Sequence, residues 1–298
     1  MSSEIKKIIL DTDIGVDCDD AAALAILLNA HKRKECVLLG ITNATTREGA
    51  SALTKIICKY YGVDVPVAVM KSKPLPCDSI NNYSRVLKQK YQENDVDDNA
   101  IDLLRKLLSE ANEKVTIIAI GPLVNIAGLL NSKADQYSEL SGMKLVKEKV
   151  QELYVMGAAF NNKIAEWNIL QDIESARMVV DKWPTKIIFS PHEVGNVIKT
   201  KMMNTHNPVW ESMAEFAIST NEKYEKDFYR QSWDPITCLL ALGKYNHLFN
   251  LSKQGKVFID EKGFASFRER KDGLHSYILL SSQLSEIEKV INISIEKE

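Results

Sequence analysis

The sequence predicts an α/β fold built on one mostly parallel, doubly wound (Rossmann-like) sheet, and two observations support this prediction. Short runs of aliphatic and β-branched residues recur along the chain, and segments with helical periodicity lie between them. The runs are continuously apolar rather than alternating, which is typical of strands that are covered on both faces. Strands and helices that alternate over short connections form parallel sheets with helices on both sides.

The elements can be placed in chain order. Buried strands are expected at residues 6–10, 36–42, 65–69, 115–121, 152–157 and 186–190. Amphipathic helices are expected at residues 19–32, 49–61, 100–111 and 172–182, the last capped by Asp172. Residues 207–245 look mainly helical and would lie near the site, and a hairpin, a last strand and a helix follow them. Because no repeat or linker divides the chain, we expect a single domain over residues 1–298.

Composition argues against a nucleic-acid-binding or membrane protein. The 298 residues have a formal net charge of −2, and no block of lysine and arginine stands out. The longest apolar region starts at Val115, is interrupted by Gly121, Pro122 and Asn125, and is too short to span a bilayer. We therefore expect a small-molecule substrate.

The N-terminus and the cysteines favour a cytoplasmic protein. The first residues, MSSEIKKIIL, enter a strand without an apolar stretch suited to secretion. The five cysteines are scattered without a CxxC pair, which is typical of reduced thiols rather than of disulfides or zinc ligands. Cys18 lies among the aspartates, and we expect its side chain to act as a small apolar filler of the core rather than as a reactive thiol.

Polar and glycine-rich stretches follow the expected strands at their carboxyl ends, where ligands bind in sheets of this kind. The stretches are Asp11 with Asp13, Asn43, residues 121–125, Met156 with Gly157, and residues 190–193. Their position makes them the first candidates for a site.

Five aspartates lie within ten residues: Asp11, Asp13, Asp17, Asp19 and Asp20. Asp17 or Asp19 can be explained as the N-cap of the following helix. Capping does not explain Asp13, which stands between a strand and a glycine turn. Because close carboxylates repel one another, we expect a cation among them, and oxygen ligands suit Ca²⁺ or Mg²⁺.

Two kinds of hydrolase place carboxylates at a strand end in this way. One is a phosphatase with an aspartate nucleophile, in which threonine or valine follows the DxD pair; here Ile14 and Gly15 follow it, which is a poor match. The other uses a metal ion to hold and acidify a water molecule. The second class fits better.

Four segments resemble the inosine–uridine-preferring nucleoside hydrolases. DTDIGVDCDDAAAL is similar to the N-terminal signature of that family, DxDxGxDDxxAL. IAIGPLVNIAGLL, then YVMGAAF with AEWNILQDIESARMVV, and finally WDPITCLLAL resemble later family segments and occur in the family order. Each match alone is weak, but four in order are specific. The resemblance implies cleavage of the N-glycosidic bond of ribonucleosides, in a protein that is usually a homodimer or homotetramer.

The resemblance also implies site residues. Ca²⁺ would be bound by Asp13, Asp20, Asp234 and the backbone carbonyl of Val124, and Asp13 would deprotonate the attacking water. The residues expected to contact the nucleoside are Asp19, Asn43, Met156, Asn162 or its neighbour Asn161, Glu166, Asn168 and Trp233. For Glu166, a role in the site is favoured over that of a surface carboxylate, because its neighbours in the sequence look buried.

The sequence departs from the family pattern at two informative places. The segment VDCDD has two positions more than the family signature, so either Asp17 or Asp19 could be the residue that contacts the sugar. We take Asp19 and Asp20 as the family pair because they directly open the helix. Trp233 stands where the pyrimidine-tolerant branch has histidine, and it resembles the purine-preferring branch, in which an aromatic face stacks on the base. Tyr83 or Trp167 is a candidate for a second aromatic wall, although packing in the core is favoured for Trp167.

Two other functions remain open. The chain could hydrolyse a related ribosyl compound, or it could be a non-catalytic descendant that binds Ca²⁺ and ribose, since the histidine and a Gly-Asn loop of the family are missing.

Overall fold

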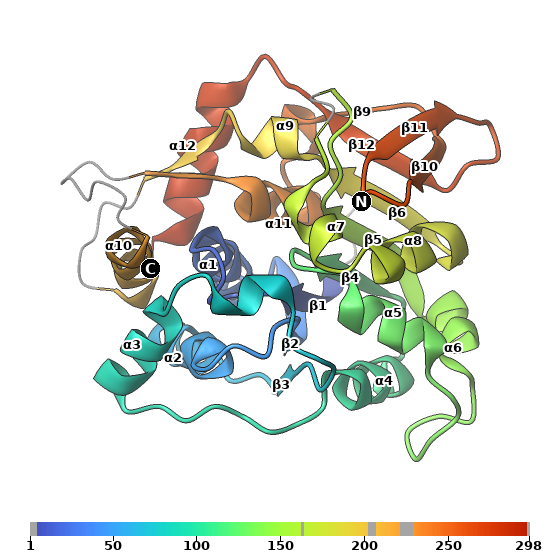
Figure 1. Cartoon of the computed structure of the whole chain (residues 1–298). Helices are drawn as coiled ribbons and strands as arrows, with labels where there is room; N and C mark the ends of the chain where they lie inside the picture. The colour runs from blue at the N-terminus through green and yellow to red at the C-terminus, as the bar shows by residue number, and fades with distance from the viewer. Residues whose placement is uncertain (1–4, 162–163, 202–206, 221–228, 297–298) are drawn as a thin grey trace.

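One large sheet crosses the molecule, and helices cover both of its faces (Figure 1). The structure, a computed structural model, describes residues 5–161, 164–201, 207–220 and 229–296. The strands of the large sheet are β1 (Lys6–Thr12), β2 (Cys36–Asn43), β3 (Val67–Val69), β4 (Val115–Ala119), β5 (Val150–Met156), β6 (Lys186–Ser190), β9 (Asn250–Leu251), β10 (Gly255–Ile259), β11 (Ala265–Glu269) and β12 (His275–Leu279). A separate pair consists of β7 (Lys199–Thr200) and β8 (Arg230–Gln231).

The strand order is β11-β10-β12-β6-β5-β4-β1-β2-β3, with β9 paired to β12. The strands β1 to β6 run parallel to their neighbours, and β12 runs parallel to β6. The expected mostly parallel, doubly wound sheet is therefore confirmed, with an antiparallel hairpin of β10 and β11 at one edge. The chain order reverses between β1 and β4, which is where ligands bind in doubly wound sheets.

The helices connect the strands and lie on both faces of the sheet. They are α1 (Asp19–Lys32), α2 (Ala50–Tyr61), α3 (Tyr83–Tyr91), α4 (Ala100–Glu110), α5 (Val124–Asn131), α6 (Gly142–Lys149), α7 (Trp167–Gln171), α8 (Ile173–Lys182), α9 (His192–Gly195), α10 (Pro208–Ser219), α11 (Trp233–Leu242) and α12 (Leu284–Ile295). Short 3₁₀ turns are η1 (Pro76–Ser79) and η2 (Asn246–Leu248). Asp172 caps α8 as expected, because its carboxylate accepts a hydrogen bond from the Ser175 amide at 3.0 Å.

Alternate strand residues enter two hydrophobic cores, one on each face of the sheet. Ile8 and Leu10 of β1 pack with α1, α11 and α12, whereas Ile9 packs with α4, α5 and α8 on the other face. Both faces of β1 are thus buried, which explains the continuous apolar run in its sequence.

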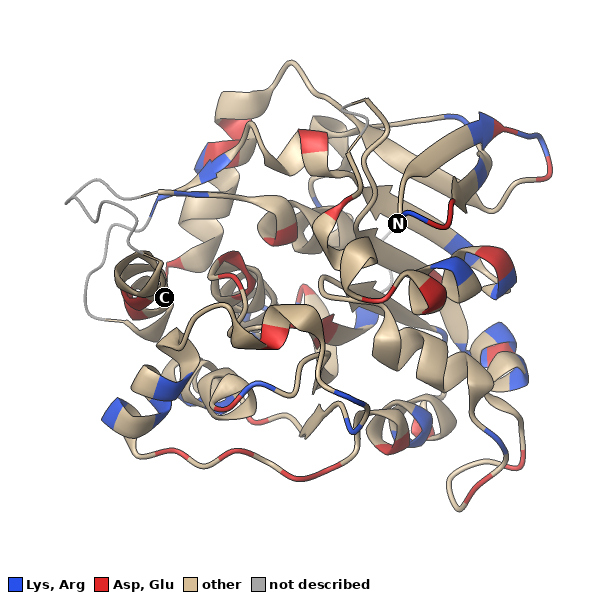
Figure 2. Cartoon of the chain, viewed as in Figure 1, with Lys and Arg blue, Asp and Glu red and all other residues tan. Residues whose placement is uncertain are grey.

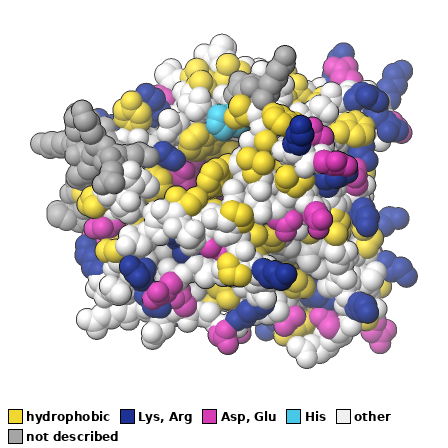
Figure 3. Space-filling view, in the orientation of Figure 1, with side chains coloured by type: hydrophobic (Ala, Val, Ile, Leu, Met, Phe, Trp, Pro, Cys, Tyr) yellow, Lys and Arg dark blue, Asp and Glu magenta, His cyan; other side chains and the backbone are white. Residues whose placement is uncertain are grey.

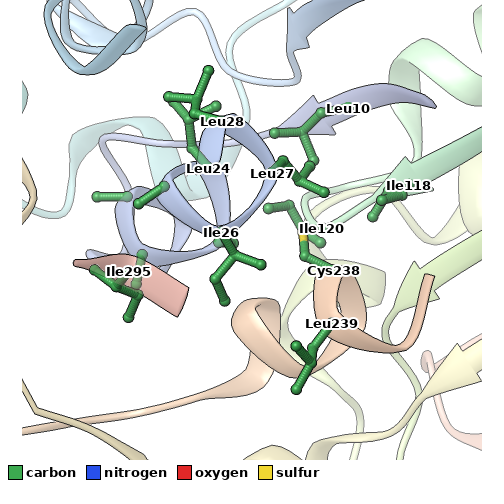
Figure 4. Packing of buried hydrophobic residues seen from close by; sticks show 14 of the residues in the cluster. Leu10, Leu24, Ile26, Leu27, Leu28, Ile118, Ile120, Cys238, Leu239 and Ile295 are labelled. Carbon is green, nitrogen blue, oxygen red and sulfur yellow. The ribbon is translucent and has the colours of Figure 1, made fainter. Parts of the chain in front are cut away.

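Helix α1 lies between the sheet and four other helices, and the expectation that it is amphipathic is wrong. Every residue from Asp19 to Ala30 is buried. The helix contacts α11, α12, α2 and α10 as well as the sheet, so none of its sides faces solvent over these residues. Figure 4 shows Leu24 and Leu27 of α1 near Leu10 of β1 and Cys238 of α11. A helix buried all round is apolar on every side, which removes the periodic signal.

Three further features concern surface charge, membrane-spanning helices and Cys18. In the view of Figure 2, basic and acidic residues are intermixed over the outer helices. None of the helices in the described part of the chain has the length and apolar character needed to cross a bilayer. Cys18 is buried, as expected of a small apolar filler.

Candidate active site

A cavity of about 320 Å³ opens at the carboxyl ends of the parallel strands. Asp13 follows β1, Ile120 follows β4, Met156 ends β5 and His192 lies just beyond β6, and all four line the cavity. In Figure 3, hydrophobic side chains form a band across this face, with carboxylates showing between them. The cavity thus lies at the reversal of the strand order, where a ligand is expected.

A larger cavity of about 770 Å³ lies at the opposite edge of the sheet. It is lined by residues from the starts of strands, among them Lys6 and Lys186, and it contains none of the predicted site residues. Size alone does not identify the site; the smaller cavity has the carboxylate chemistry.

Three carboxylates of the smaller cavity come together from two helices. Asp19 and Asp20 open α1, Asp234 is the second residue of α11, and one oxygen of each lies within 4.8 Å of the others. All three are buried. The Asp234 amide donates a hydrogen bond to Asp19 at 3.1 Å, and the Thr12 hydroxyl donates one to Asp20. These contacts hold the two helix starts together.

The carboxylate cluster concentrates negative charge in a place with little water. Burial, followed by the charge of Asp19, raises the pKa of Asp234 well above its usual range, and burial and Asp17 do the same for Asp19. Burial raises the pKa of Asp20 to about 7. A divalent cation would remove this repulsion, and three carboxylate oxygens are suitable ligands for a hard cation. The residues therefore fit a metal site.

Asp13 lies beside this cluster and is not one of the three. It is buried and lines the cavity, and burial followed by the charge of Asp20 raises its pKa well above the usual range. A Cβ atom added to Gly121 would come within 2.8 Å of Asp13 Oδ1, so glycine is needed for this close approach. Asp13 thus lies where β1 and β4 end side by side.

Asp17 has a different partner from Asp19. Its carboxylate accepts a hydrogen bond from Arg230 Nε at 2.9 Å and a second from Arg230 Nη2. The backbone carbonyl of Asp17 accepts a hydrogen bond from the Tyr83 hydroxyl. Asp19 rather than Asp17 therefore joins Asp20, in line with the choice of the final pair.

Glu166 and Asn168 line the cavity at α7. Glu166 caps this helix, accepting hydrogen bonds from the amides of Asn168 at 2.9 Å and Ile169 at 3.1 Å, and burial raises its pKa to about 7. Asn168 donates a hydrogen bond to the carbonyl of Ile120 at 3.1 Å and contacts Met156 Sδ at 3.3 Å. The two side chains are thus fixed against the ends of β4 and β5.

Aromatic rings border the same cavity. The ring of Trp233 is stacked with that of His192, with centroids 5.7 Å apart and 25° between the planes. Phe216 of α10 lines the cavity beside Arg230, whose guanidinium lies 4.9 Å from the Phe216 ring. Trp167 also lines the cavity and is 49% exposed, so its expected place in the core is wrong: it follows the Glu166 cap and faces outward.

Two predicted site residues, Asn43 and Val124, and the candidate aromatic wall Tyr83 do not line the cavity. The amide of Asn43 donates to Thr54 Oγ1 at 3.2 Å inside the protein, and Asn43 does not line the cavity. Val124 begins α5 and is also not among the lining residues. Asn162 lies outside the described residues. Tyr83, a candidate aromatic wall, is fully buried and donates its hydroxyl to the loop before α1.

Sequence reasoning gave no role to His192, Phe216 or Arg230. His192 had a signal, because it lies two residues beyond the end of an expected strand. Phe216 and Arg230 lie in the region 207–245 that was expected near the site, but no local pattern singled out either residue. Buried carboxylates, a buried amide and aromatic rings in one cavity can bind a cation and a polar ligand that has a flat part.

The fold is similar to that of solved structures. A crystal structure of an inosine-uridine preferring nucleoside hydrolase from Bacillus anthracis matches with a TM-score of 0.70 at 17% identity, covering 99% of this chain and 100% of that one. That likeness concerns the fold.

Curated relatives are similar over part of the chain. A non-specific ribonucleoside hydrolase, RihC, from Klebsiella pneumoniae (strain 342) is 30% identical over 184 residues, which is 58% of this chain and 57% of the relative. A pyrimidine-specific ribonucleoside hydrolase, RihA, from Escherichia coli O7:K1 is 28% identical over 190 residues, 58% and 56% of the two chains. The matched part thus spans little more than half the length of these relatives.

The family match is more extensive than either pairwise match. The family described as inosine-uridine preferring nucleoside hydrolase matches residues 8–276, which include the carboxylate cluster, α7 and Trp233. The chain belongs to the inosine-uridine preferring nucleoside hydrolase family.

Proposed function

We propose that the protein is a Ca²⁺-dependent N-ribohydrolase that cleaves ribonucleosides to free base and ribose. The observation that supports this most is that the cluster of Asp19, Asp20 and Asp234 lines the same cavity as Glu166 and Asn168. The cavity of about 320 Å³ is near the lower end of the range of about 300–1,000 Å³ for small-molecule sites.

The residues of the cavity would have different roles in the reaction. Asp20 and Asp234 would hold the metal ion, with Asp13 beside them, and Asp19 would accept a hydrogen bond from a ribose hydroxyl. When bound, Ca²⁺ would supply positive charge that anchors sugar hydroxyls and polarises a water molecule. Asp13, which lines the cavity beside these carboxylates, would take the proton of the water that adds to the sugar.

Glu166 and Asn168 would hold the other side of the sugar. The Glu166 carboxylate accepts hydrogen bonds from the backbone amides of Asn168 and Ile169 and lines the cavity, where it would also accept one from a ribose hydroxyl group. Because both residues are fixed to the scaffold, the sugar would be bound without side-chain rearrangement.

A reducing-sugar assay on a panel of ribonucleosides tests the proposal. Free ribose from at least one nucleoside, in the presence of calcium, is the expected result. Calcium-dependent binding of ribose without release would indicate a non-catalytic descendant. Release only from another class of ribosyl compound would indicate a different substrate.

Charge favours neutral nucleosides over phosphorylated ones. Six carboxylates and one guanidinium line the cavity among the described residues, and a divalent cation would offset only part of the excess. We therefore expect inosine to have a kcat/KM about 100-fold or more above that of inosine 5′-monophosphate, equivalent to about 2.7 kcal/mol. Equal rates for the two would contradict the charge argument, and Arg230 would then be the residue to examine for phosphate binding.

The aromatic rings that line the cavity favour substrates with a purine base. Trp233 and Trp167 offer flat surfaces at the cavity, and a purine has the larger face to stack on them. We expect kcat/KM for inosine, adenosine or guanosine to exceed that for uridine at least ~10-fold, or about 1.4 kcal/mol.

The Trp233→Ala enzyme should lose most of its purine activity and little of any uridine activity. Glu166→Gln is the matched control, because a residue that binds the shared sugar should affect both substrates alike. A native enzyme that cleaves uridine as well as inosine would disprove the stacking argument.

A further inference from the structure

The departing base needs a proton, and Trp233 cannot give one. An indole N–H is a hydrogen-bond donor without an accessible acidic proton. In this structure it is already engaged, because Trp233 Nε1 donates to the backbone carbonyl of His192 at 3.1 Å. Arg230 remains charged under all ordinary conditions and is paired with Asp17. Among the described residues that line the cavity, His192 is the one with an imidazole.

The backbone of His192 is fixed on both sides. Its amide donates to the carbonyl of Ala158 at 2.9 Å, and its carbonyl accepts the indole N–H of Trp233. Gly195 lets α9 approach the indole closely: a Cβ atom there would lie 2.3 Å from Trp233 Cδ1. The stacked imidazole and indole rings are therefore held together at the cavity, with Trp233 as the positioning residue.

We propose that His192 is the general acid that protonates the leaving base. This rests on the proposed nucleoside hydrolase function. The C1′–N bond breaks with its electron pair moving to the base, and the imidazolium N–H proton passes to a ring nitrogen of that base. Water adds at C1′ and gives its proton to Asp13. Ribose and neutral base are released, and proton exchange with solvent restores His192 and Asp13.

The surroundings of His192 suit this role. Burial lowers its pKa, which makes the imidazolium a stronger acid, while the charge of Glu193 on the same helix raises it. The other charged groups that line the cavity are Arg230, whose guanidinium lies 5.3 Å from the centre of the Trp233 ring, and the carboxylates of Asp13, Asp17, Asp19, Asp20, Glu166 and Asp234.

Leaving-group dependence tests the proposal. p-Nitrophenyl β-D-ribofuranoside releases a phenolate that departs without protonation, whereas inosine needs an acid. His192→Asn should lower kcat/KM for inosine about 100-fold or more and leave the nitrophenyl riboside within ~5-fold of the native enzyme. The exposed His247 of η2 offers a matched control, and His247→Asn should leave both activities unchanged.

The result that overturns the proposal is an equal loss on both substrates, or no loss on inosine. Activity on the nitrophenyl riboside also reports whether the variant is folded. A native enzyme that releases ribose from neither compound would contradict the proposed function itself, so the two failures can be told apart.

Discussion

Asp13→Ala is expected to lower kcat for nucleosides by about 10³-fold or more while the protein stays folded. The carboxylate lies between the ends of β1 and β4 in the cavity, and its removal takes away the proposed base. It also removes one of several mutually repelling buried carboxylates, so in the presence of a chelator the melting temperature should stay equal or rise. Steady-state kinetics and thermal unfolding of the purified variant measure the two effects.

Asp11 is the matched control for Asp13. Both are buried near the end of β1, but Asp11 does not line the cavity and accepts hydrogen bonds from Thr42 and from Asn125 Nδ2, the latter at 2.8 Å. Asp11→Asn should therefore reduce stability more than turnover, since it disturbs buried hydrogen bonds. An Asp13→Ala enzyme that retains turnover would show that another group activates the water.

Metal binding should change both the stability of the protein and its dependence on pH. Burial raises the pKa values of Asp20 and Glu166 to about 7, against ordinary values of 3.8 and 4.5. The folded state thus binds more protons than the unfolded state in this range, so the metal-free protein loses stability as pH rises from about 4 to about 7. For Glu166 alone, the shift corresponds to a change on the order of 3 kcal/mol.

Calcium should oppose this loss. At a concentration 100 times its Kd it would stabilise the native state by about 2.7 kcal/mol, and most strongly where the carboxylates are ionised. The measurement is thermal unfolding at pH 5.5 and 7.5, with chelator and with calcium. Asp234→Asn should abolish the calcium effect. A metal-free melting temperature that rises towards pH 7.5 would contradict the described electrostatics.

Much of the fold could be predicted because local sequence and tertiary structure agree. The expected helix at residues 19–32 has the same bounds as α1, and the expected strand at 186–190 has those of β6. The amphipathic expectation for α1 failed because packing on all sides selects apolar residues everywhere. Helices α3 and α6 were not expected; with nine and eight residues they are shorter than the four helices that were.

The candidate site could be predicted only where its residues lie in strand ends or family segments. Asp13, Asp19, Asp20, Glu166 and Asp234 come together in the cavity, because parallel strands and the first turns of α1, α7 and α11 share one edge of the sheet.

The direction of a side chain was harder to predict than the position of its residue. Asn43 follows a strand as expected, yet its amide turns to Thr54 inside the protein. Trp167, next to a buried carboxylate, turns outward to the cavity mouth. Arg230 reaches Asp17 across 213 residues of sequence, a pairing that no local pattern indicates.

The most direct test of the proposed function is the release of free ribose from inosine by metal-stripped enzyme before and after calcium is restored. We expect no release without metal, full recovery with calcium, and no recovery for Asp234→Asn. Release that persists in chelator and in the Asp234→Asn enzyme, or no release with calcium bound, would contradict a calcium-dependent nucleoside hydrolase.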